Sequence, residues 1–267
     1  MDGNERLDFD LVNRPAYGGE QAVREFVTAS GWLDPGERTA VEFPLALGGA
    51  GPVLDIGYGG GRTVPLMRGL YQGYTGIDYT PELVRAAQKR FPDVDLRQMD
   101  ARKLDFPDGS FGLASFSFNG IDSVDEEGRL AIFREVHRVL RPRGFFVFSA
   151  LNHHSLRDRA PLRLPDRPSV RHPRALLRWI LSLPVSYLNA RRLNRWRVED
   201  TDSSVRTVPA LHCALIARYI SVPAQVRQSA EQGFETLAIY DHLGKPTDPD
   251  DIAPTADYLH YVTRKTT

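Results

Sequence analysis

Short apolar runs alternate with amphipathic stretches between residues 52 and 150. The apolar runs predict five strands: residues 52–56, 74–77, 94–99, 112–118 and 145–150. Strands of a parallel sheet are covered on both faces, so they are nearly continuous apolar segments. The stretches between them repeat apolar residues at helical spacing and predict helices: residues 62–70, 81–90 and 125–140. This alternation is typical of an α/β fold wound around one sheet.

The chain on either side of this region adds further elements. Residues 18–30 and 37–47 predict two helices before the first strand. Residues 221–233 predict a helix, and residues 234–240 and 258–264 predict two more strands. The expected architecture is therefore a seven-stranded, mostly parallel sheet with helices on both faces.

Residues 152–220 interrupt the alternation. They predict two helices separated by Pro184, followed by one or two strands interrupted by Pro209. Their position directly after the fifth strand favours an insertion that acts as a lid or recognises a substrate. We expect three parts: residues 1–151 with the N-terminal helices and the ligand-binding core, residues 152–220 as the insertion, and residues 221–267 with the last helix and the last two strands.

Charge is balanced over the whole chain, because 34 basic and 34 acidic side chains give a net charge of zero. With no global field to attract polyanions, we expect neither nucleic acid nor a membrane as partner, and any basic surface must be local. Residues 155–197 are such a segment, with 11 arginines against Asp158 and Asp166. Only 4 of the 34 basic residues are lysine, a bias that a GC-rich genome produces without selection for binding.

Cysteine content and the N-terminal residues favour a cytoplasmic protein. Cys213 is the only cysteine, which excludes an internal disulfide framework and a thiolate zinc cluster. The first six residues are polar and half of them are charged, unlike a secretory signal. No apolar run reaches the length of a membrane span.

The first predicted strand ends in the sequence DIGYGGGR, residues 55–62. Glycine permits a tight turn and lets a ligand approach the backbone, and the next helix points its positive end at the same place. A dinucleotide motif counted from Gly57, G-x-G-x-x-G, would need glycine where Arg62 stands, which disfavours an NAD(P) oxidoreductase. The pattern D-x-G-x-G-G-G resembles instead the signature of class I S-adenosylmethionine-dependent methyltransferases. The resemblance covers residues 52–149 and, weakly, residues 219–265.

This resemblance implies a Rossmann-like fold with S-adenosyl-L-methionine as cofactor. The implied cofactor-binding residues lie in the N-terminal helices, the glycine turn and the ends of the next strands: Tyr17, Asp55, Gly57, Gly59, Gly61, Asp78, Tyr79, Asp100, Ala101 and Asn119. Asp78, at the end of the second strand, would accept hydrogen bonds from ribose hydroxyls, and Asp100 with the Ala101 backbone would meet the adenine. Asp100 could instead close a turn, and Tyr17 could pack at a domain edge.

The implied reaction is transfer of a methyl group to oxygen or nitrogen of a small-molecule metabolite by direct in-line displacement. A base helps when the acceptor carries a proton, and the candidates are Asp122 after the fourth strand and His153 after the fifth. His154 could simply form hydrogen bonds at the start of a loop. Because adjacent histidines point in different directions, we expect no metal site.

The arginine-rich segment leaves several interpretations open. Its arginines could bind an anionic acceptor beneath a closing lid, or even RNA. They could instead face solvent while the apolar side of a helix packs on the core or on a second subunit, which leaves a homodimer open. A noncatalytic use of the fold is a further alternative. The acceptor itself cannot be read, because the segment that would define it lies outside the resemblance.

Overall fold

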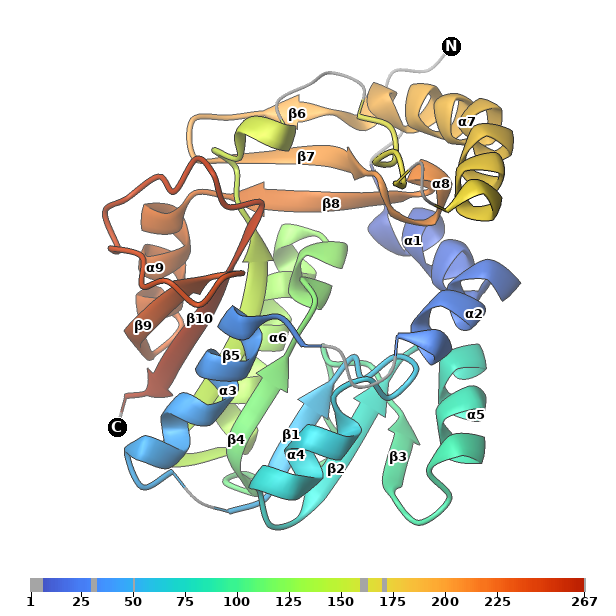
Figure 1. The fold of residues 1–267 in the computed structure, drawn as a ribbon. Coiled ribbons are helices and arrows are strands. Elements are labelled where there is room, and N and C mark those ends of the chain that lie inside the picture. Colours follow the sequence, from blue (N-terminus) through green and yellow to red (C-terminus); the bar gives the residue numbers. More distant parts are fainter. Residues whose placement is uncertain (1–6, 30–32, 50, 159–162, 170–171, 267) are drawn as a thin grey trace.

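The computed structural model describes residues 7–29, 33–49, 51–158, 163–169 and 172–266. At its centre is a seven-stranded sheet in the order β3-β2-β1-β4-β5-β10-β9 (Figure 1). The strands are β1 (Val53–Ile56), β2 (Tyr74–Asp78), β3 (Asp95–Gln98), β4 (Phe111–Phe116), β5 (Leu140–Leu151), β9 (Phe234–Asp241) and β10 (Tyr258–Lys265). The first five are parallel, and β10 is antiparallel to both β5 and β9. The predicted seven-stranded, mostly parallel sheet is confirmed.

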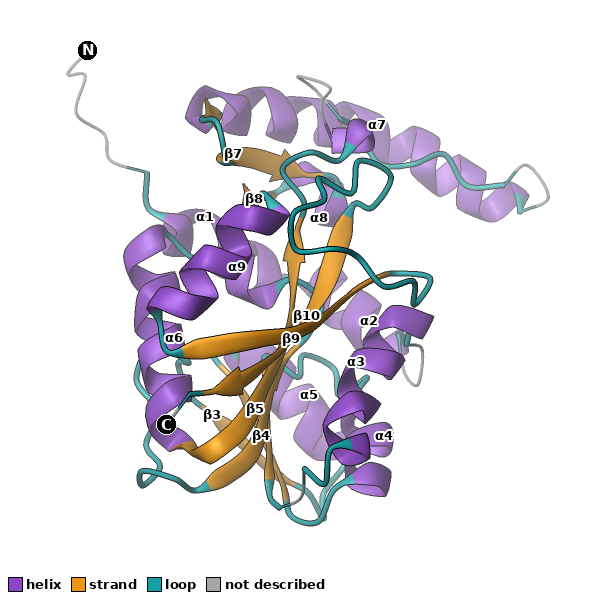
Figure 2. Ribbon diagram, turned by 90° about the vertical axis from the view of Figure 1, so that its left-hand side faces the viewer, coloured by secondary structure: helices purple, strands orange, loops and turns teal. Residues whose placement is uncertain are grey.

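Helices cover both faces of this sheet (Figure 2). They are α3 (Pro35–Ala46), α4 (Val64–Leu70), α5 (Pro81–Arg90), α6 (Glu126–Val139) and α9 (Val222–Glu231). Because side chains along a strand alternate between the two faces, β5 contributes to two separate apolar clusters. Phe146 and Phe148 pack with Phe133 of α6, whereas Phe145 and Val147 pack with residues of α3 and α4. The sheet is therefore buried on both sides, as its apolar strands predict.

Two helices, α1 (Phe9–Gly18) and α2 (Glu20–Thr28), precede α3. The sequence predicts only one helix here, over residues 18–30, so α1 is an addition to the expected fold. It begins after Asp8, whose side chain accepts hydrogen bonds from the first backbone N–H groups. Only Phe9 and Asn13 of α1 are buried, and so few buried positions leave little apolar periodicity in the sequence.

The described residues between positions 152 and 220 form a second layer over the carboxyl ends of the parallel strands (Figure 1), and we call this segment the cap. Its elements are η2 (Leu156–Asp158), α7 (Pro173–Leu193), η3 (Asn194–Trp196), β6 (Val198–Glu199), β7 (Ser203–Val208), α8 (Ala210–Cys213) and β8 (Leu215–Ile220). The three strands make a separate antiparallel sheet. β7 and β8 lie on either side of Pro209, as predicted. Among the described helices, none has both the length and the hydropathy required to cross a bilayer.

α7 is one helix, although the sequence predicts two helices separated by Pro184. Proline lacks the N–H that would bond the carbonyl four residues earlier, and its ring crowds that carbonyl, so a break is the usual result. In α7 the segment after the proline is buried on the cap through Ser186, Ala190 and Leu193. This packing holds the second half of α7 in line with the first.

Arg129 of α6 has a completely buried side chain that joins the core to α9. Its guanidinium donates to Asp122, which lies in the turn η1 after β4, and to Gln225 and Gln228 of α9. The second oxygen of Asp122 accepts a hydrogen bond from the backbone N–H of Leu151 at 2.7 Å. Burial raises the pKa of Asp122 to about 6 and Arg129 opposes this rise, so the pair is ionic at neutral pH.

Arg129→Met is expected to lower the free energy of unfolding by about 3–5 kcal/mol, because it leaves a buried carboxylate without its cation. Urea unfolding followed by circular dichroism measures the change. The double variant Arg129→Met/Asp122→Asn should recover part of the loss, since it removes the charge together with its partner. Arg134→Met is the matched control, because Arg134 lies exposed on the same helix and should leave stability close to wild type. Equal losses in Arg129→Met and Arg134→Met would contradict this role.

Candidate active site

The turn after β1 requires glycine at two positions in particular. Gly59 has a φ of +57°, which other residues rarely adopt. At Gly60 the backbone of α2 approaches so closely that a Cβ would lie 2.2 Å from the carbonyl oxygen of Phe26. Arg62, where a dinucleotide motif has glycine, pairs with Glu37 of α3 through hydrogen bonds of 2.6 and 2.7 Å. The turn is therefore fixed between α2 and α3.

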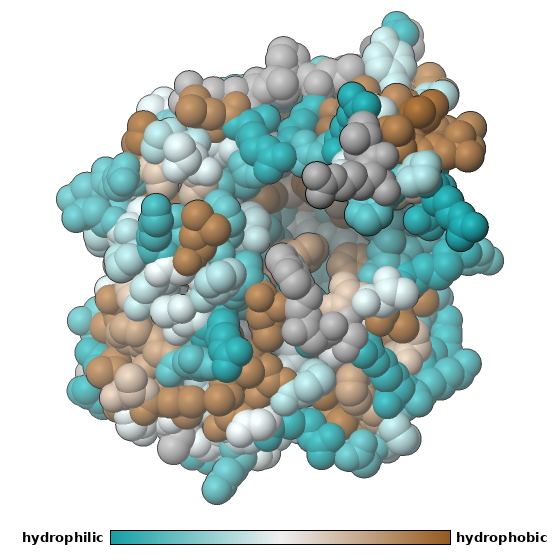
Figure 3. All heavy atoms as spheres, viewed as in Figure 1, coloured by the Kyte–Doolittle hydropathy of each residue, from teal (hydrophilic) through white to brown (hydrophobic). Residues whose placement is uncertain are grey.

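A cavity of about 300 Å³ lies between this turn, the ends of the parallel strands, the N-terminal helices and the cap; Figure 3 shows a hollow in this region. Its wall includes eight of the residues predicted to bind the cofactor: Tyr17, Gly57, Gly59, Asp78, Tyr79, Asp100, Ala101 and Asn119. The cap side of the wall consists of Val208, Ala210, Leu215, Ile216 and Ala217. The cavity thus has polar groups on its sheet side and an apolar cap side.

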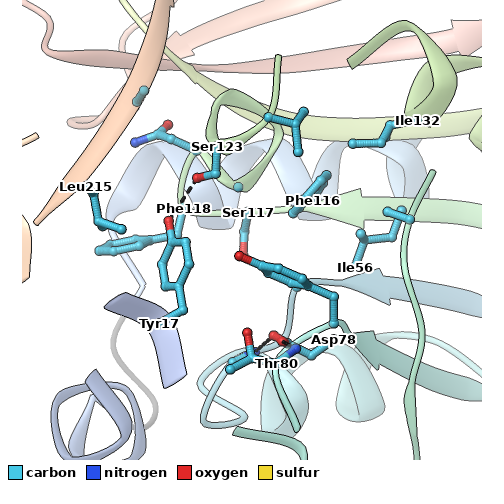
Figure 4. Close-up of a pocket in the computed structure, with 18 of the residues that line it drawn as sticks. Tyr17, Ile56, Asp78, Thr80, Phe116, Ser117, Phe118, Ser123, Ile132 and Leu215 are labelled. Atoms are coloured by element: carbon cyan, nitrogen blue, oxygen red, sulfur yellow. Dashed lines mark hydrogen bonds between the residues drawn. The ribbon is translucent and has the colours of Figure 1, made fainter. Parts of the chain in front are cut away.

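Asp78 ends β2 and is oriented by two backbone groups. Its Oδ2 accepts a hydrogen bond from the N–H of Gly59 at 2.9 Å, and its Oδ1 accepts one from the N–H of Thr80 at 2.8 Å (Figure 4). Burial raises the pKa of Asp78, although both hydrogen bonds act against the rise. A carboxylate oxygen can accept two hydrogen bonds, and each oxygen of Asp78 accepts one from these backbone groups. Asp78 therefore keeps acceptor sites for a ligand in the cavity.

Asp100 follows β3 and belongs to a small network of charges. Its Oδ1 accepts a hydrogen bond from the N–H of Arg102 at 2.9 Å, which closes a turn. The Arg102 guanidinium also contacts Asp100 at 2.6 Å and Asp10 of α1 at 2.7 Å. Burial opposes ionisation, but the hydrogen bonds from Arg102 lower the pKa of Asp100 below its usual value. Asp100 therefore closes a turn, as one of the two interpretations expects, and it also belongs to the wall of the cavity.

Tyr17 of α1 contacts the cavity and also packs on other rings. Its hydroxyl lies 2.8 Å from Oγ of Ser123 (Figure 4). The centroid of its ring lies 6.1 Å from that of Phe26 and 6.3 Å from that of Tyr79. Burial raises the pKa of the phenol, so Tyr17 is neutral at physiological pH and can either donate or accept a hydrogen bond.

Asp55 and Gly61, also predicted to contact the cofactor, lie outside the described wall of the cavity. Oδ2 of Asp55 accepts hydrogen bonds from Thr63 at 2.5 Å and from Tyr74 at 2.8 Å. Burial raises the pKa of Asp55 to about 6, and these two hydrogen bonds offset part of the rise. At Gly61 a Cβ would lie 2.5 Å from the ring of Phe91. Both residues shape the turn from behind, and their direct contact with the cofactor stays a prediction.

The two predicted bases are likewise absent from the described wall. Asp122 is completely buried in its pair with Arg129. His153 is 9% exposed, and its Nδ1 lies 3.0 Å from Oγ of Ser204 in β7. Burial and the nearby Arg206 lower the pKa of His153, which keeps the ring neutral. The geometry therefore does not support either residue as the proton acceptor, and both instead hold the start of the cap.

Sequence reasoning missed several wall residues that come from distant segments. Asp10, Ser117 and Ser123 line the cavity, and so do the apolar residues of the cap. The one sequence signal for Asp10 is Asp8 two residues earlier, which marks the start of α1. The cap residues belong to β7, α8 and β8, and nothing in their sequence shows which side faces the core.

A family model and solved structures of known proteins are similar to this chain and show its fold. A sequence family described as methyltransferase domain matches residues 53–144. The structure is similar to a 1,6-didemethyltoxoflavin N1-methyltransferase from Burkholderia thailandensis with bound S-adenosylhomocysteine, with a TM-score of 0.60 and 15% identity over 100% of this chain and 94% of that one. A glycopeptide N-methyltransferase complexed with S-adenosylmethionine gives a TM-score of 0.55 and 19% identity over 89% of this chain and 96% of that one.

A relative of higher identity decides the family. A phosphatidylethanolamine N-methyltransferase from Cereibacter sphaeroides is 34% identical over 176 residues, which are 64% of this chain and 81% of the relative. The chain belongs to the class I S-adenosylmethionine-dependent methyltransferases. This methyltransferase also resembles a ubiquinone/menaquinone biosynthesis C-methyltransferase from Desulfotalea psychrophila, with 33% identity over 141 residues, 51% of this chain and 50% of the relative. The match thus spans about half the length of that second relative.

The cavity of the methyltransferase fits S-adenosylmethionine. One buried polar atom of a wall residue, Oδ1 of Asn119, has no hydrogen-bond partner among the described residues. A polar ligand can satisfy it, and buried polar atoms are normally satisfied. The remaining acceptor sites of Asp78 would bind the ribose, and the absence of a side chain at Gly59 leaves room beside the turn. When bound, the cofactor supplies an electrophilic methyl group on its sulfonium.

Asp78→Ala is expected to weaken the binding of S-adenosylhomocysteine by roughly 1.5–3 kcal/mol, or about 10- to 150-fold, because a charged acceptor for two hydroxyls is lost. Isothermal titration calorimetry measures the affinity. Asp93→Ala, which removes an exposed carboxylate paired with Arg68, should bind like wild type. Unchanged affinity in a folded Asp78→Ala would show that the carboxylate only closes the turn.

The raised pKa of Asp55 predicts a dependence of stability on pH. A carboxyl with a pKa of about 6 in the folded state and 3.8 in the unfolded state is protonated more in the folded state between these values. Its contribution to stability therefore falls as the pH rises from about 4 to about 6. Asp55→Asn lacks this decline, so its stability relative to wild type should increase by up to about 3 kcal/mol across that window.

Urea unfolding at several pH values measures the difference between Asp55→Asn and wild type. Asp105→Asn is the control, because it makes the same substitution at an exposed carboxylate. A difference for Asp55→Asn that stays constant from pH 4 to 7 would refute the assignment.

Proposed function

We propose that the enzyme transfers the methyl group to an oxygen or nitrogen of a small-molecule acceptor with a largely apolar body. The observation that carries this proposal is the apolar cap side of the cavity: Val208, Ala210, Leu215, Ile216 and Ala217. Phe116 is the last residue of β4 and Phe118 follows it in the next turn. Both add aromatic surface on the sheet side of the cavity (Figure 4). Burial of apolar surface contributes about 25 cal/mol per Å². Such a wall favours an acceptor that brings apolar surface with it.

The charges of the wall support a neutral or weakly charged acceptor. Among the described wall residues Arg102 is the one cation, and its guanidinium is paired with Asp10 and Asp100. The exposed Arg191 and Arg192 of α7 do not belong to the wall. An RNA or a phosphorylated acceptor would need cations where its phosphates lie.

The names of two similar proteins support nitrogen as the methylated atom. The relative from Cereibacter sphaeroides is an N-methyltransferase of phosphatidylethanolamine, and the structural neighbour from Burkholderia thailandensis is an N1-methyltransferase. The relative from Desulfotalea psychrophila is a C-methyltransferase of quinone biosynthesis, which makes carbon the second candidate for the methylated atom.

The wall supports a transfer that depends on positioning more than on proton removal. No histidine is among the described wall residues, and the phenol of Tyr17 is neutral. The hydroxyls of Tyr17 and Ser123 form a pair that can hold an acceptor nitrogen or oxygen by hydrogen bonds. The apolar cap side excludes water from the same space. We therefore favour an acceptor whose lone pair is available without a strong base.

A panel of acceptors tests the proposed function. Purified enzyme is incubated with S-adenosylmethionine and with amines and hydroxyl compounds that carry either a long apolar or a short polar body. Mass spectrometry measures formation of S-adenosylhomocysteine, and NMR of the product identifies the methylated atom. Turnover that increases with the apolar body would support the proposal. Turnover of polar acceptors alone, or methylation at carbon alone, would overturn it.

Leu215→Asn is expected to raise the KM for the acceptor about 5- to 30-fold, because a polar amide replaces part of the apolar cap side at similar volume. The affinity for S-adenosylhomocysteine should stay unchanged. Steady-state kinetics and calorimetry measure the two quantities. Leu243→Asn makes the same substitution at a residue that is 58% exposed and should alter neither. A parallel fall in cofactor affinity would place Leu215 on the cofactor side instead.

A further inference from the structure

α7 presents an apolar stripe to solvent, although its opposite face is already packed on the cap. The stripe consists of residues whose exposed fractions lie between 48% and 68%: Leu177, Ile180, Leu181, Val185 and Leu188. Their spacing of three and four residues aligns them along one side of the helix for about 17 Å. In Figure 3 brown spheres gather at the upper right, where Figure 1 places α7. A surface helix normally carries polar residues on the side that faces water.

Arginines flank the α7 stripe at both ends. Arg174 and Arg178 precede most of it, Arg191 and Arg192 follow it, and all four side chains are exposed. None of the four forms an ion pair within the described part of the chain, and residues 173–197 include no aspartate or glutamate. The solvent side of α7 therefore combines an apolar centre with ends of purely positive charge.

We propose that α7 docks on an anionic lipid surface. A helix with an apolar face and arginines beside it lies in the plane of a membrane interface, with its apolar side chains at the boundary of the acyl chains. Long arginine side chains reach from there to lipid phosphates, and each basic residue near an anionic leaflet adds attraction. Ser186, Ala190 and Leu193 stay packed on the other elements of the cap. α7 would therefore lie along the lipid surface, with the rest of the cap on its far side.

The same charges disfavour other occupants of the stripe. Two copies of α7 packed antiparallel would bring the arginines of one end against those of the other end, and parallel packing would bring each end against itself. No acidic side chain of the segment compensates either arrangement. A nucleic acid would contact the arginines but would leave the apolar centre exposed to water. An anionic lipid surface pairs with the arginines and also covers the apolar centre of the stripe.

This docking would bring the membrane next to the wall of the cavity. Asn189 of α7 donates a hydrogen bond to the carbonyl oxygen of His212 in α8 at 3.0 Å, and Ala210 of α8 lines the cavity. In Figure 2, α7 extends beyond the rest of the cap, and the side chains of its stripe are exposed. The proposal goes beyond the proposed function, because it does not depend on the identity of the acceptor.

Vesicle cosedimentation of the full chain, without cofactor or acceptor, tests the proposal. Wild type is expected to bind vesicles of phosphatidylcholine with phosphatidylglycerol more tightly than vesicles of phosphatidylcholine alone, and salt should weaken the difference. Leu181→Asp/Leu188→Asp should weaken binding by at least about tenfold, because it charges the apolar centre. Arg191→Gln/Arg192→Gln should remove part of the preference for anionic vesicles. Leu243→Asp, at an exposed leucine outside α7, is the matched control and should bind like wild type.

Binding of S-adenosylhomocysteine, measured in parallel, shows that each variant is folded. Equal vesicle binding by wild type and Leu181→Asp/Leu188→Asp would overturn the proposal, and so would equal binding to neutral and anionic vesicles. A dimer in light scattering that the same leucine substitutions disrupt, with no binding to vesicles, would assign the stripe to a second copy and would also overturn it. The acceptor panel is run without vesicles, so failure of one proposal leaves the other standing.

Discussion

The buried guanidinium of Arg129 determines how the cap is attached to the core. The cap leaves the sheet after Leu151, whose N–H is held by Asp122, and the chain returns to the core in α9, where Gln225 and Gln228 accept hydrogen bonds from Arg129. One ion pair therefore fixes both ends of the inserted segment. Since the cavity wall draws on the cap as well as on the sheet, the shape of the site depends on this buried pair. A buried charge without partners at this position would cost several kcal/mol. The contacts of Arg129 with Asp122, Gln225 and Gln228 therefore have to form together.

The sheet could be predicted because each of its determinants is local. The central strands β1, β4 and β5 contain short apolar runs, and the glycine turn after β1 is encoded by eight consecutive residues. Asp78 could be placed for the same reason, since it directly follows an apolar run. Asp122 could not, because its position after β4 suggested an accessible carboxylate, whereas its burial depends on Arg129 and on glutamines of α9. Arg129 lies 96 residues from Gln225 in the sequence, and no periodicity connects them.

The cap could be predicted only in part, because its backbone depends on packing against other segments. Pro184 predicts a break in α7, but buried residues further along the helix override it. Leu211, His212 and Cys213 have φ values of +48°, +56° and +57°, a left-handed conformation that their sequence does not favour. Such a conformation persists only where the surroundings impose it. α8 lies between α7 and the cavity. Asn189 of α7 donates a hydrogen bond to it on one side, and its Ala210 belongs to the cavity wall on the other.

The cap therefore has two apolar sides with different surroundings. Its inner side, from β7, α8 and β8, faces the cavity, while the stripe of α7 faces outward. A net charge of zero hides this arrangement, because the arginines concentrated in the cap are balanced by carboxylates elsewhere in the chain. Screening limits the reach of a charge in solution to about 10 Å, so a surface responds to the residues near it and not to the total. The absence of a global field excludes long-range attraction, but it leaves α7 free to act through its own arginines and leucines.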